Sequence, residues 1–354
     1  MKIVHTADLH LAENAPERWE ALKEITALAE KEGADLLVIA GDLFDHVEAA
    51  EKLRSGLREL FSRGSFKTLI LPGNHDCPAY REGLYFGDRV FLLTDPLKPL
   101  RFNNLVFWGL PFARISGEPL VEQLRCMGAA MDPADQNILI YHGELLDAYF
   151  SRRDLGAEGE QRYMPVKLSY FEQLPLQYVL AGHFHARYAG WPLPGGGRFI
   201  YSGSPVAVTR RELGRRAVNL LQPGQEAVEL LLDSCHYEEL ILDLDPLGRE
   251  NPLDLLKDKL EQIHRQARLL LTVRGFFNGA ALGFNESDLA RQIRSLCGDV
   301  LGDPPQEQYA DISYLLNDDL FKRARQKLEA SAVAESEKEK ALEMIIEAFR
   351  AVKS

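Results

Sequence analysis

The stretch Leu71-Pro72-Gly73-Asn74-His75-Asp76 closes a run of hydrophobic residues that begins at Thr68. A short apolar run that stops at Pro-Gly is typical of a buried strand followed by a turn. This turn places an amide, an imidazole and a carboxylate side by side, a combination that folding rarely needs. Asn74 offers a neutral oxygen ligand and His75 offers an acid or a base, so the stretch indicates the middle of a hydrolytic metal site.

The same pattern, a buried strand that ends in polar side chains, recurs on both sides of this stretch. The polar residues are Asp8 and His10 after the strand expected at 3–7, Asp42 after 35–40, His142 after 137–141, and His183 and His185 after 178–181. Helical periodicity at 16–31 and 47–63 separates the first three strands, which is the alternation of an α/β fold. Functional groups at strand ends are usual in such folds, and these ligand types suit two divalent ions that share a carboxylate.

Length and composition bound the class of protein. The chain has 354 residues, of which 46% are hydrophobic and 27% charged, so it can bury a large core and is expected to form two domains with a short appendage. No apolar run approaches the roughly 20 residues of a membrane span and no signal region precedes the first strand, so we expect a cytoplasmic protein without membrane association. The four scattered cysteines include no C-x-x-C pair and indicate neither a zinc knuckle nor a disulfide framework.

The charge distribution bears on the substrate. A formal net charge of -12 argues against a surface that binds phosphate throughout. Between Arg152 and Arg216, however, basic residues outnumber acidic ones. These arginines either face a polyanion or form a solvated rim of ordinary ion pairs, and the sequence leaves both interpretations open.

Together and in this order, D-x-H at Asp8, G-D at Asp42, G-N-H-D at Asn74, the strand-end His142 and G-H-x-H at His183 resemble the motif set of the calcineurin-like metallophosphoesterases. Within that superfamily the chain is most similar to the bacterial SbcD-type nuclease subunits of DNA double-strand-break repair, including their YhaO-like branch. The resemblance implies an α/β (α+β) fold with a four-layer αββα metallophosphoesterase core, a small α+β capping domain and C-terminal helices.

The resemblance, which covers residues 2–208, also implies a centre of two divalent ions. The metal implied is manganese, with iron or zinc as alternatives that oxygen and imidazole ligands also suit. One ion would be held by Asp8, His10, Asp42 and His185, and the other by Asp42, Asn74, His142 and His183. Asp42 would bridge the two ions, which together would activate a shared water and neutralise charge on a phosphoryl oxygen.

The same resemblance gives roles to two further residues of the central stretch. His75 would not be a ligand; as the catalytic residue it would contact the scissile phosphate and stabilise the transition state or protonate the leaving oxygen. Asp76 would orient His75, with a turn or capping role as an equal alternative. Some nucleases of this family carry a histidine three positions after the bridging aspartate, where this chain has Asp45, so His46 is not expected to be catalytic.

The organisation changes after Gly224, and we expect three parts: a nuclease domain at 1–224, an α+β capping domain at 225–316 and a helical segment at 317–354. In the resembling nucleases the cap helps to admit DNA, and the helical segment binds an SMC-like coiled-coil ATPase subunit, the SbcC-like partner. A homodimer is a further assembly that the resemblance allows. The alternatives are a passive cap and helices that pack on their own domain. The helical segment carries an apolar stripe at Leu342, Ile345, Ile346 and Phe349.

We therefore expect a metal-dependent DNA phosphodiesterase, an exonuclease with or without endonuclease activity, that serves as a subunit in double-strand-break repair. The same centre hydrolyses many phosphate esters, so the first alternative is a phosphatase or a phosphodiesterase of cyclic nucleotides or other small molecules. The second alternative is a structural subunit that keeps the fold without the activity.

Overall fold

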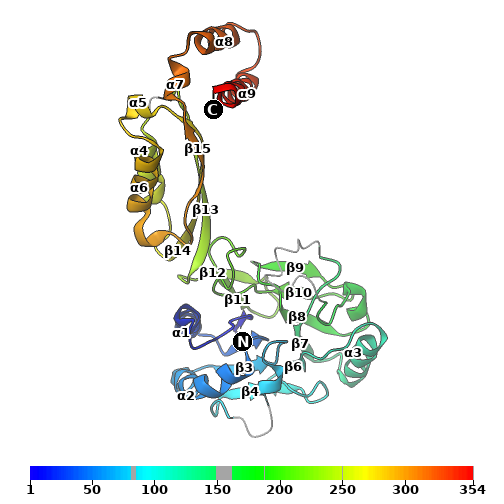
Figure 1. The fold of residues 1–354 in the computed structure, drawn as a ribbon. Coiled ribbons are helices and arrows are strands. Elements are labelled where there is room, and N and C mark those ends of the chain that lie inside the picture. Colours follow the sequence, from blue (N-terminus) through cyan, green and yellow to red (C-terminus); the bar gives the residue numbers. More distant parts are fainter. Residues whose placement is uncertain (81–84, 149–161, 187, 249, 354) are drawn as a thin grey trace. The chain divides into compact units, whose positions relative to one another are not determined.

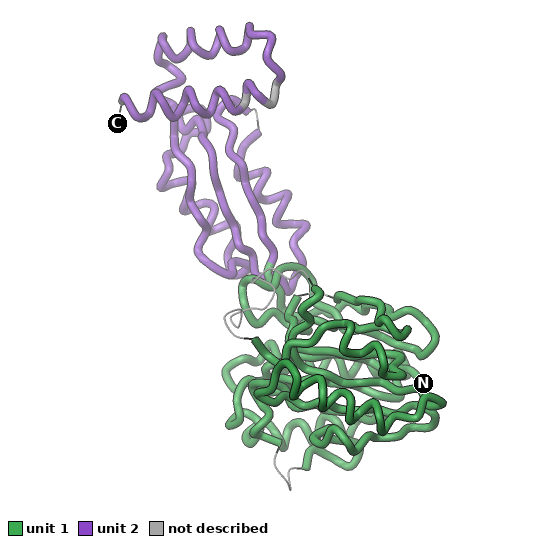
Figure 2. Tube along the Cα trace, turned by 90° about the vertical axis from the view of Figure 1, so that its right-hand side faces the viewer, with its two compact units in different colours: residues 1–237 green, residues 238–354 purple. Residues whose placement is uncertain are grey.

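The computed structural model describes residues 1–80, 85–148, 162–186, 188–248 and 250–353. These residues form two compact units, Met1–Tyr237 and Glu238–Ser354 (Figure 2). Each unit has a hydrophobic core of its own. The three-part division predicted from the sequence, with boundaries after residues 224 and 316, stays a prediction.

The first unit contains two six-stranded sheets, and the first of them carries the N-terminal strands (Figure 1). Its order is β12-β11-β1-β2-β3-β4. The strands are β1 (Ile3–Thr6), β2 (Leu36–Ala40), β3 (Lys67–Leu71), β4 (Val90–Leu92), β11 (Ala217–Leu221) and β12 (Val228–Leu231). Strands β1 to β4 are parallel, whereas β11 and β12 add an antiparallel edge. The loops that follow β1, β2 and β3 therefore leave the sheet at the same end.

The second sheet has the order β5-β6-β7-β8-β10-β9. Its strands are β5 (Leu100–Phe102), β6 (Leu105–Leu110), β7 (Gln136–His142), β8 (Leu176–Gly182), β9 (Ala189–Pro192) and β10 (Arg198–Tyr201). Strands β6, β7, β8 and β10 are parallel, and the outer strands β5 and β9 are antiparallel to their neighbours. Because β7 and β8 are parallel neighbours, they deliver their carboxyl-terminal residues to the same end of the sheet.

Helices cover the outer face of each sheet, and the two inner faces pack together. The helices are α1 (Pro16–Lys31) and α2 (Val47–Arg63) on the first sheet and α3 (Glu118–Ala130) on the second, with short 3-10 helices at Cys77–Ala79 and Leu168–Phe171 (Figure 1). Side chains of β2 alternate between the faces: Leu37 and Ile39 join the core under the helices, while Leu36 and Val38 join the core between the sheets. The result is a four-layer αββα core, which confirms the predicted fold class.

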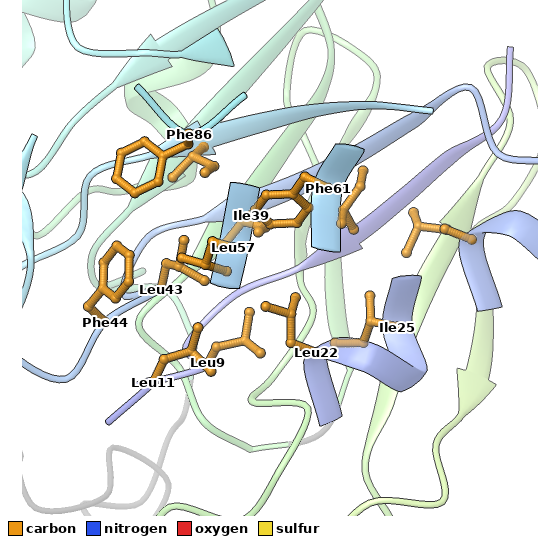
Figure 3. Close-up of a cluster of buried hydrophobic side chains, with 14 of the residues drawn as sticks. Leu9, Leu11, Leu22, Ile25, Ile39, Leu43, Phe44, Leu57, Phe61 and Phe86 are labelled. Atoms are coloured by element: carbon orange, nitrogen blue, oxygen red, sulfur yellow. The ribbon is translucent and has the colours of Figure 1, made fainter. Parts of the chain in front are cut away.

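The core under α1 and α2 also anchors one of the strand-end loops (Figure 3). Leu57 and Phe61, four residues apart on α2, lie on one face of the helix and share a buried cluster with Ile39 of β2. Leu43 and Phe44, in the loop after β2, belong to the same cluster and are fully buried. Packing of two large apolar side chains therefore holds this loop in place.

The second unit is built on a three-stranded sheet of order β13-β14-β15. Its elements are β13 (His236–Leu244), α4 (Pro252–Leu260), β14 (Ala267–Phe277), α5 (Gly279–Leu282), α6 (Glu286–Cys297), a 3-10 turn at Gly298–Val300, β15 (Gln306–Asp311), α7 (Ser313–Leu316), α8 (Asp319–Glu329) and α9 (Glu335–Lys353). Side chains of α4 and α6 pack with those of the sheet in one core. None of the helices in the described ranges is both long enough and apolar enough to cross a membrane.

Helices α7, α8 and α9 enclose a smaller core. Ile346 of α9 is 1% exposed, and the ring of Phe349 lies edge-on to that of Phe321 with 5.4 Å between centroids. The apolar stripe predicted in the helical segment therefore packs within the unit. The exposed apolar side chains of α9 are others, Met344 at 70% and Val352 at 85% exposure.

Candidate metal centre

The ends of five strands, β1, β2, β3, β7 and β8, bring the seven predicted ligands together. They are Asp8, His10, Asp42, Asn74, His142, His183 and His185. Asn74 is half-buried and the other six are buried. Because buried polar and charged side chains are costly unless they are paired or bind an ion, this concentration calls for a ligand.

One group of ligand atoms belongs to Asp8, His10 and His185. Their candidate ligand atoms all lie within 4.8 Å of one another. The two Nε2 atoms of His10 and His185 are 3.3 Å apart, and Nε2 of His185 lies 3.9 Å from Oδ1 of Asp8. These three side chains surround a point that a single cation can occupy.

A second group lies on the other side of Asp42. Oδ1 of Asn74 is 2.8 Å from Nε2 of His142 and 3.2 Å from Nδ1 of His183. Oδ2 of Asp42 is 3.2 Å from Nε2 of His142 and 3.9 Å from Nε2 of His10. Asp42 therefore reaches both groups, as a carboxylate shared by two ions must.

The spacing of these atoms fits metal ligation. Ligand atoms held roughly 2.0–2.2 Å from one ion lie about 3.0–3.5 Å from each other. The 3.3 Å between His10 and His185 and the 3.2 Å between Asp42 and His142 fall in this range. Carboxylate, amide and imidazole ligands without a thiolate suit manganese, iron or zinc.

The backbone is strained where it presents these ligands. Asp8, His10, Asp42 and His183 have φ of 56°, 48°, 49° and 94°, in the left-handed region that residues with a side chain rarely adopt. The chain also approaches the site closely at Gly41, where an added Cβ would stand 1.9 Å from Nδ1 of His142. Strain at four of the seven predicted ligands is typical of a functional site rather than of a passive loop.

The charges of the centre are strongly coupled. Burial alone would raise the pKa of Asp42, but His142 and His10 outweigh burial and hold this pKa well below its usual range. Burial would lower the pKa of His142, yet Asp42 raises it to about 10. Burial raises the pKa of Asp8, against the opposing effect of the histidines. Two buried carboxylates among several imidazoles form an environment that favours a bound cation.

His75 lies beside the ligands and is half-buried. Its backbone N–H donates to Oδ1 of Asp42 at 2.9 Å, and its Nδ1 is 3.0 Å from the carbonyl oxygen of Asp45. Its ring stands edge-on to that of His10, with 4.6 Å between centroids. Because a carbonyl oxygen only accepts, the proton sits on Nδ1, and Nε2 is the nitrogen that can exchange a proton with a substrate.

Asp76 is buried and joins the loops after β2 and β3. Its carboxylate accepts hydrogen bonds from the backbone N–H of Gly73 at 2.8 Å and of Phe44 at 3.1 Å, and from the hydroxyl of Tyr80 at 2.9 Å. Burial and the nearby charge of Asp42 raise its pKa to about 7. These contacts brace the two loops against each other, and the orientation of His75 by Asp76 stays a prediction.

Two buried residues near the centre were not singled out by the sequence. Glu212 accepts hydrogen bonds from Nδ1 of His185 at 3.2 Å and from Oγ of Ser204 at 2.8 Å. Burial opposes its charge, but His185 and Arg216 outweigh burial and lower its pKa to about 2. Arg216 is 2% exposed and donates to the carbonyl oxygens of Ser204 and His185. The sequence offered only a weak signal, a single acid among four arginines.

The basic segment between Arg152 and Arg216 is therefore not one continuous surface. Arg216 is buried in the network just described, whereas Arg210 and Arg211 are exposed. Arg198 pairs with Glu226 at 3.4 Å. Three further members of the segment, Arg152, Arg153 and Arg187, lie outside the described residues.

A pocket of about 460 Å³ opens beside the centre. Asn74 and His75 line it, together with Phe112, Arg114, Ser116, Arg162 and Tyr163 among others. The ring of Tyr163 lies 4.9 Å from that of His183 and 5.9 Å from that of Phe112. A larger pocket of about 750 Å³ lies in the second unit and includes none of the predicted ligands, so the smaller one is the candidate substrate pocket.

Comparison with known proteins gives consistent results. Residues 1–187 match the family model of the calcineurin-like phosphoesterases. A protein from Staphylococcus epidermidis, named as the SbcD component of the nuclease SbcCD, is 30% identical over 255 residues, which are 61% of this chain and 64% of that protein. The protein of the same name from Staphylococcus saprophyticus is 32% identical over 135 residues, 33% of this chain and 35% of that protein. The chain thus spans less than two thirds of the length of either relative.

Among solved structures, a dimetal phosphatase from Danio rerio superposes with a TM-score of 0.49 and 11% identity. The superposition covers 65% of this chain and 95% of the phosphatase.

Proposed function

Because this chain belongs to the calcineurin-like phosphoesterase family, we propose that it is a metal-dependent DNA phosphodiesterase with two divalent ions, manganese by preference, at the strand ends of its first unit. The observation that carries this proposal is the convergence of seven side chains from five separate strand ends. Their chemistry, carboxylate, amide and imidazole, suits hard and borderline divalent ions. Iron and zinc are the alternative metals.

In the proposed arrangement Asp42 is the shared ligand. Asp8, His10 and His185 complete one ion site, and Asn74, His142 and His183 complete the other. The distances from Oδ2 of Asp42 to His142 and to His10, 3.2 Å and 3.9 Å, support this division. When bound, two such ions supply Lewis acidity and lower the pKa of water at the site.

His75 is the proposed catalytic residue. The 3.0 Å contact of its Nδ1 with the carbonyl oxygen of Asp45 fixes the orientation of the ring. His75 also lines the pocket beside the centre, where a phosphate ester would lie. In the protonated ring, Nε2–H stabilises charge on a phosphoryl oxygen or passes its proton to the leaving oxygen.

DNA is the proposed substrate because the pocket combines aromatic and cationic side chains. Phe112 and Tyr163 provide ring faces on which a base can stack, and Arg114 and Arg162 provide cations for backbone phosphates. The relatives are named as components of a nuclease, which supports the same substrate class. We therefore propose exonuclease activity, with or without endonuclease activity, in double-strand-break repair.

The proposed partner is an SMC-like coiled-coil ATPase subunit, which would bind the helical segment of the second unit. Ile346 and Phe349 are engaged in the core of that unit, so they are not available for docking. Met344 and Val352 are exposed and lie two helical turns apart, on one face of α9. This exposed face is the better candidate for partner contact, and a homodimer or a cap that admits DNA are further proposals for the second unit.

The test is a comparison of substrates. The full chain, freed of metal and then supplied with Mn²⁺, would be assayed on single-stranded DNA, duplex ends, a chromogenic phosphodiester and phosphate monoesters, with the metal-free protein as the control. We expect hydrolysis of DNA and of the phosphodiester. Activity confined to monoesters would contradict the nuclease proposal and favour a phosphatase. Inactivity on every substrate, with Mn²⁺, Fe²⁺ or Zn²⁺ and in the presence of the partner ATPase, would favour a structural role.

A further inference from the structure

The two groups of ligands differ in what lies behind their imidazoles. In the Asp8 group, Nδ1 of His10 is 3.3 Å from Oδ1 of Asp45, and Nδ1 of His185 is 3.2 Å from Oε1 of Glu212. In the Asn74 group, Nδ1 of His142 is 2.8 Å from the carbonyl oxygen of Ala40. Each imidazole of the first group therefore has a carboxylate partner, whereas His142 has a neutral one.

These partners determine which ring nitrogen can bind an ion. A carboxylate only accepts hydrogen bonds, so it fixes the proton of its histidine on Nδ1 and leaves the lone pair on Nε2. The Nε2 atoms of His10 and His185 are the two that approach each other at 3.3 Å in the centre. A carboxylate behind an imidazole also makes the imidazole a more basic ligand than a backbone carbonyl does.

Glu212 is held rigidly for this task. Its side chain is 2% exposed. Besides His185 it accepts from Oγ of Ser204 at 2.8 Å and from the backbone N–H groups of Val208 and Thr209 at 3.0 and 2.9 Å. The segment between Ser204 and Thr209 is thus tied to one carboxylate, and that carboxylate is tied to one ligand.

Asp45 is held less firmly. Its side chain is 40% exposed, and it also contacts Nη1 of Arg18 at 3.2 Å. Water therefore screens its charge more than that of Glu212, and its effect on His10 is expected to be the smaller of the two.

We propose that Glu212 and Asp45 are positioning residues which make the Asp8, His10 and His185 site the tighter of two divalent cation sites, so that the centre fills in a fixed order. The ion at Asn74, His142 and His183 is the second to bind and the first to leave. This inference rests on the proposed two-ion centre. Loss of such an outer partner typically weakens metal binding by about 10–100-fold, so the asymmetry is large enough to measure.

The experiment is a calorimetric titration of the metal-free full chain with Mn²⁺. The parent is expected to bind two ions in distinguishable steps. Glu212→Gln is expected to weaken the tighter step by about 10–100-fold, and Asp45→Asn to weaken the same step by less. Glu144→Gln is the matched control: Glu144 is also a buried carboxylate near the centre, but its partners are Arg162 and the backbone of Tyr163.

Two backgrounds assign the effect to one site. In Asn74→Ala, which retains the Asp8 group, Glu212→Gln should weaken the remaining ion. In His10→Ala, which retains the Asn74 group, it should change the remaining ion little. The thermal midpoint of each metal-free variant shows whether it folds, and Asp45→Asn, altered at a half-exposed side chain, keeps the test decisive if Glu212→Gln does not fold.

Several outcomes would overturn the inference. Equal weakening in both backgrounds, weakening of the Asn74 site alone, or the same loss from Glu144→Gln would each remove the assigned role of Glu212. A third ion that Asp45→Asn abolishes would make Asp45 a ligand rather than a partner of His10. A parent that binds two ions while these variants fail leaves the proposed function intact, whereas a parent that binds fewer than two overturns both.

Discussion

The strand-end loops of the first unit and the helices α7 to α9 of the second unit use their side chains in opposite ways. The loops bury carboxylates and imidazoles and hold four of them at strained backbone angles. The helices bury apolar rings such as Phe321 and Phe349. Among the described residues, every group of acidic, histidine or cysteine side chains close enough to hold a metal ion lies in the first unit.

This contrast shows where stability has been given up for chemistry. Buried charges and positive φ angles cost free energy, and they persist only where the surrounding packing imposes them. In the first unit the packing of Leu43 and Phe44 supplies that constraint directly beside Asp42. In the second unit no such constraint is needed, because the apolar side chains of α8 and α9 stabilise the fold that they belong to. Substitutions in the two regions should therefore have different consequences.

The largest effect is expected from Asp42→Ala. Asp42 is the only proposed ligand that reaches both groups, so its loss should remove both ions and lower turnover by roughly 10³-fold or more. Metal analysis of the purified variant measures the first effect and the DNA assay the second. A variant that keeps two equivalents of Mn²⁺ would remove Asp42 from its bridging role.

His75→Ala separates chemistry from metal binding. His75 contacts Asp42 through its backbone N–H, which the substitution retains, so both ions should stay bound. Turnover should fall by about 10²–10⁴-fold, the usual contribution of a general acid or base. The measurement is the ratio of metal content to activity. Loss of both ions in this variant would make His75 a residue of the metal site rather than the catalytic residue.

Phe321→Ala should act on the second unit alone. Phe321 is 1% exposed and packs against Phe349, so its truncation should cost about 3–5 kcal/mol of that unit's stability. Mn²⁺ binding should be unchanged, because the candidate centre lies in the first unit. Thermal unfolding followed with and without Mn²⁺ tests this. A matched loss of metal affinity would mean that the two regions are not independent.

The smallest effect on stability, and the sharpest on assembly, is expected from Met344→Glu. Met344 is 70% exposed, so the change should alter stability by within about 0.5 kcal/mol. Binding of the partner ATPase should weaken tenfold or more if this face of α9 is the docking face. Phe349→Glu is the contrasting variant, because it places a charge in the small core and should lower stability instead. Unchanged partner affinity in Met344→Glu would exclude this face.

The sequence was sufficient for features that depend on local pattern. Alternating apolar runs and the turn at Pro72-Gly73 predict strands and their ends, and the helices expected at 16–31 and 47–63 occur at those bounds. Polar residues at strand ends predict a shared site because parallel strands finish at the same end of a sheet. Those signals were enough to anticipate the αββα core.

The sequence was not sufficient where a contact joins distant residues of ordinary composition. Glu212 lies 27 positions from His185 and stands among arginines that look like a surface segment. Helical periodicity identified the stripe containing Phe349, but it could not indicate that Phe321 covers the stripe. Only the fold shows which charged residues are buried and which apolar ones remain exposed.

The most direct measurement is anomalous diffraction at the manganese edge from crystals of the full chain grown with Mn²⁺. Two peaks are expected, roughly 3.5–4 Å apart, with the carboxylate of Asp42 between them. One should lie among Asp8, His10 and His185, and the other among Asn74, His142 and His183. Peaks elsewhere in the chain, or a single peak that Asp42 does not contact, would contradict the assignment of this cluster as a two-ion centre.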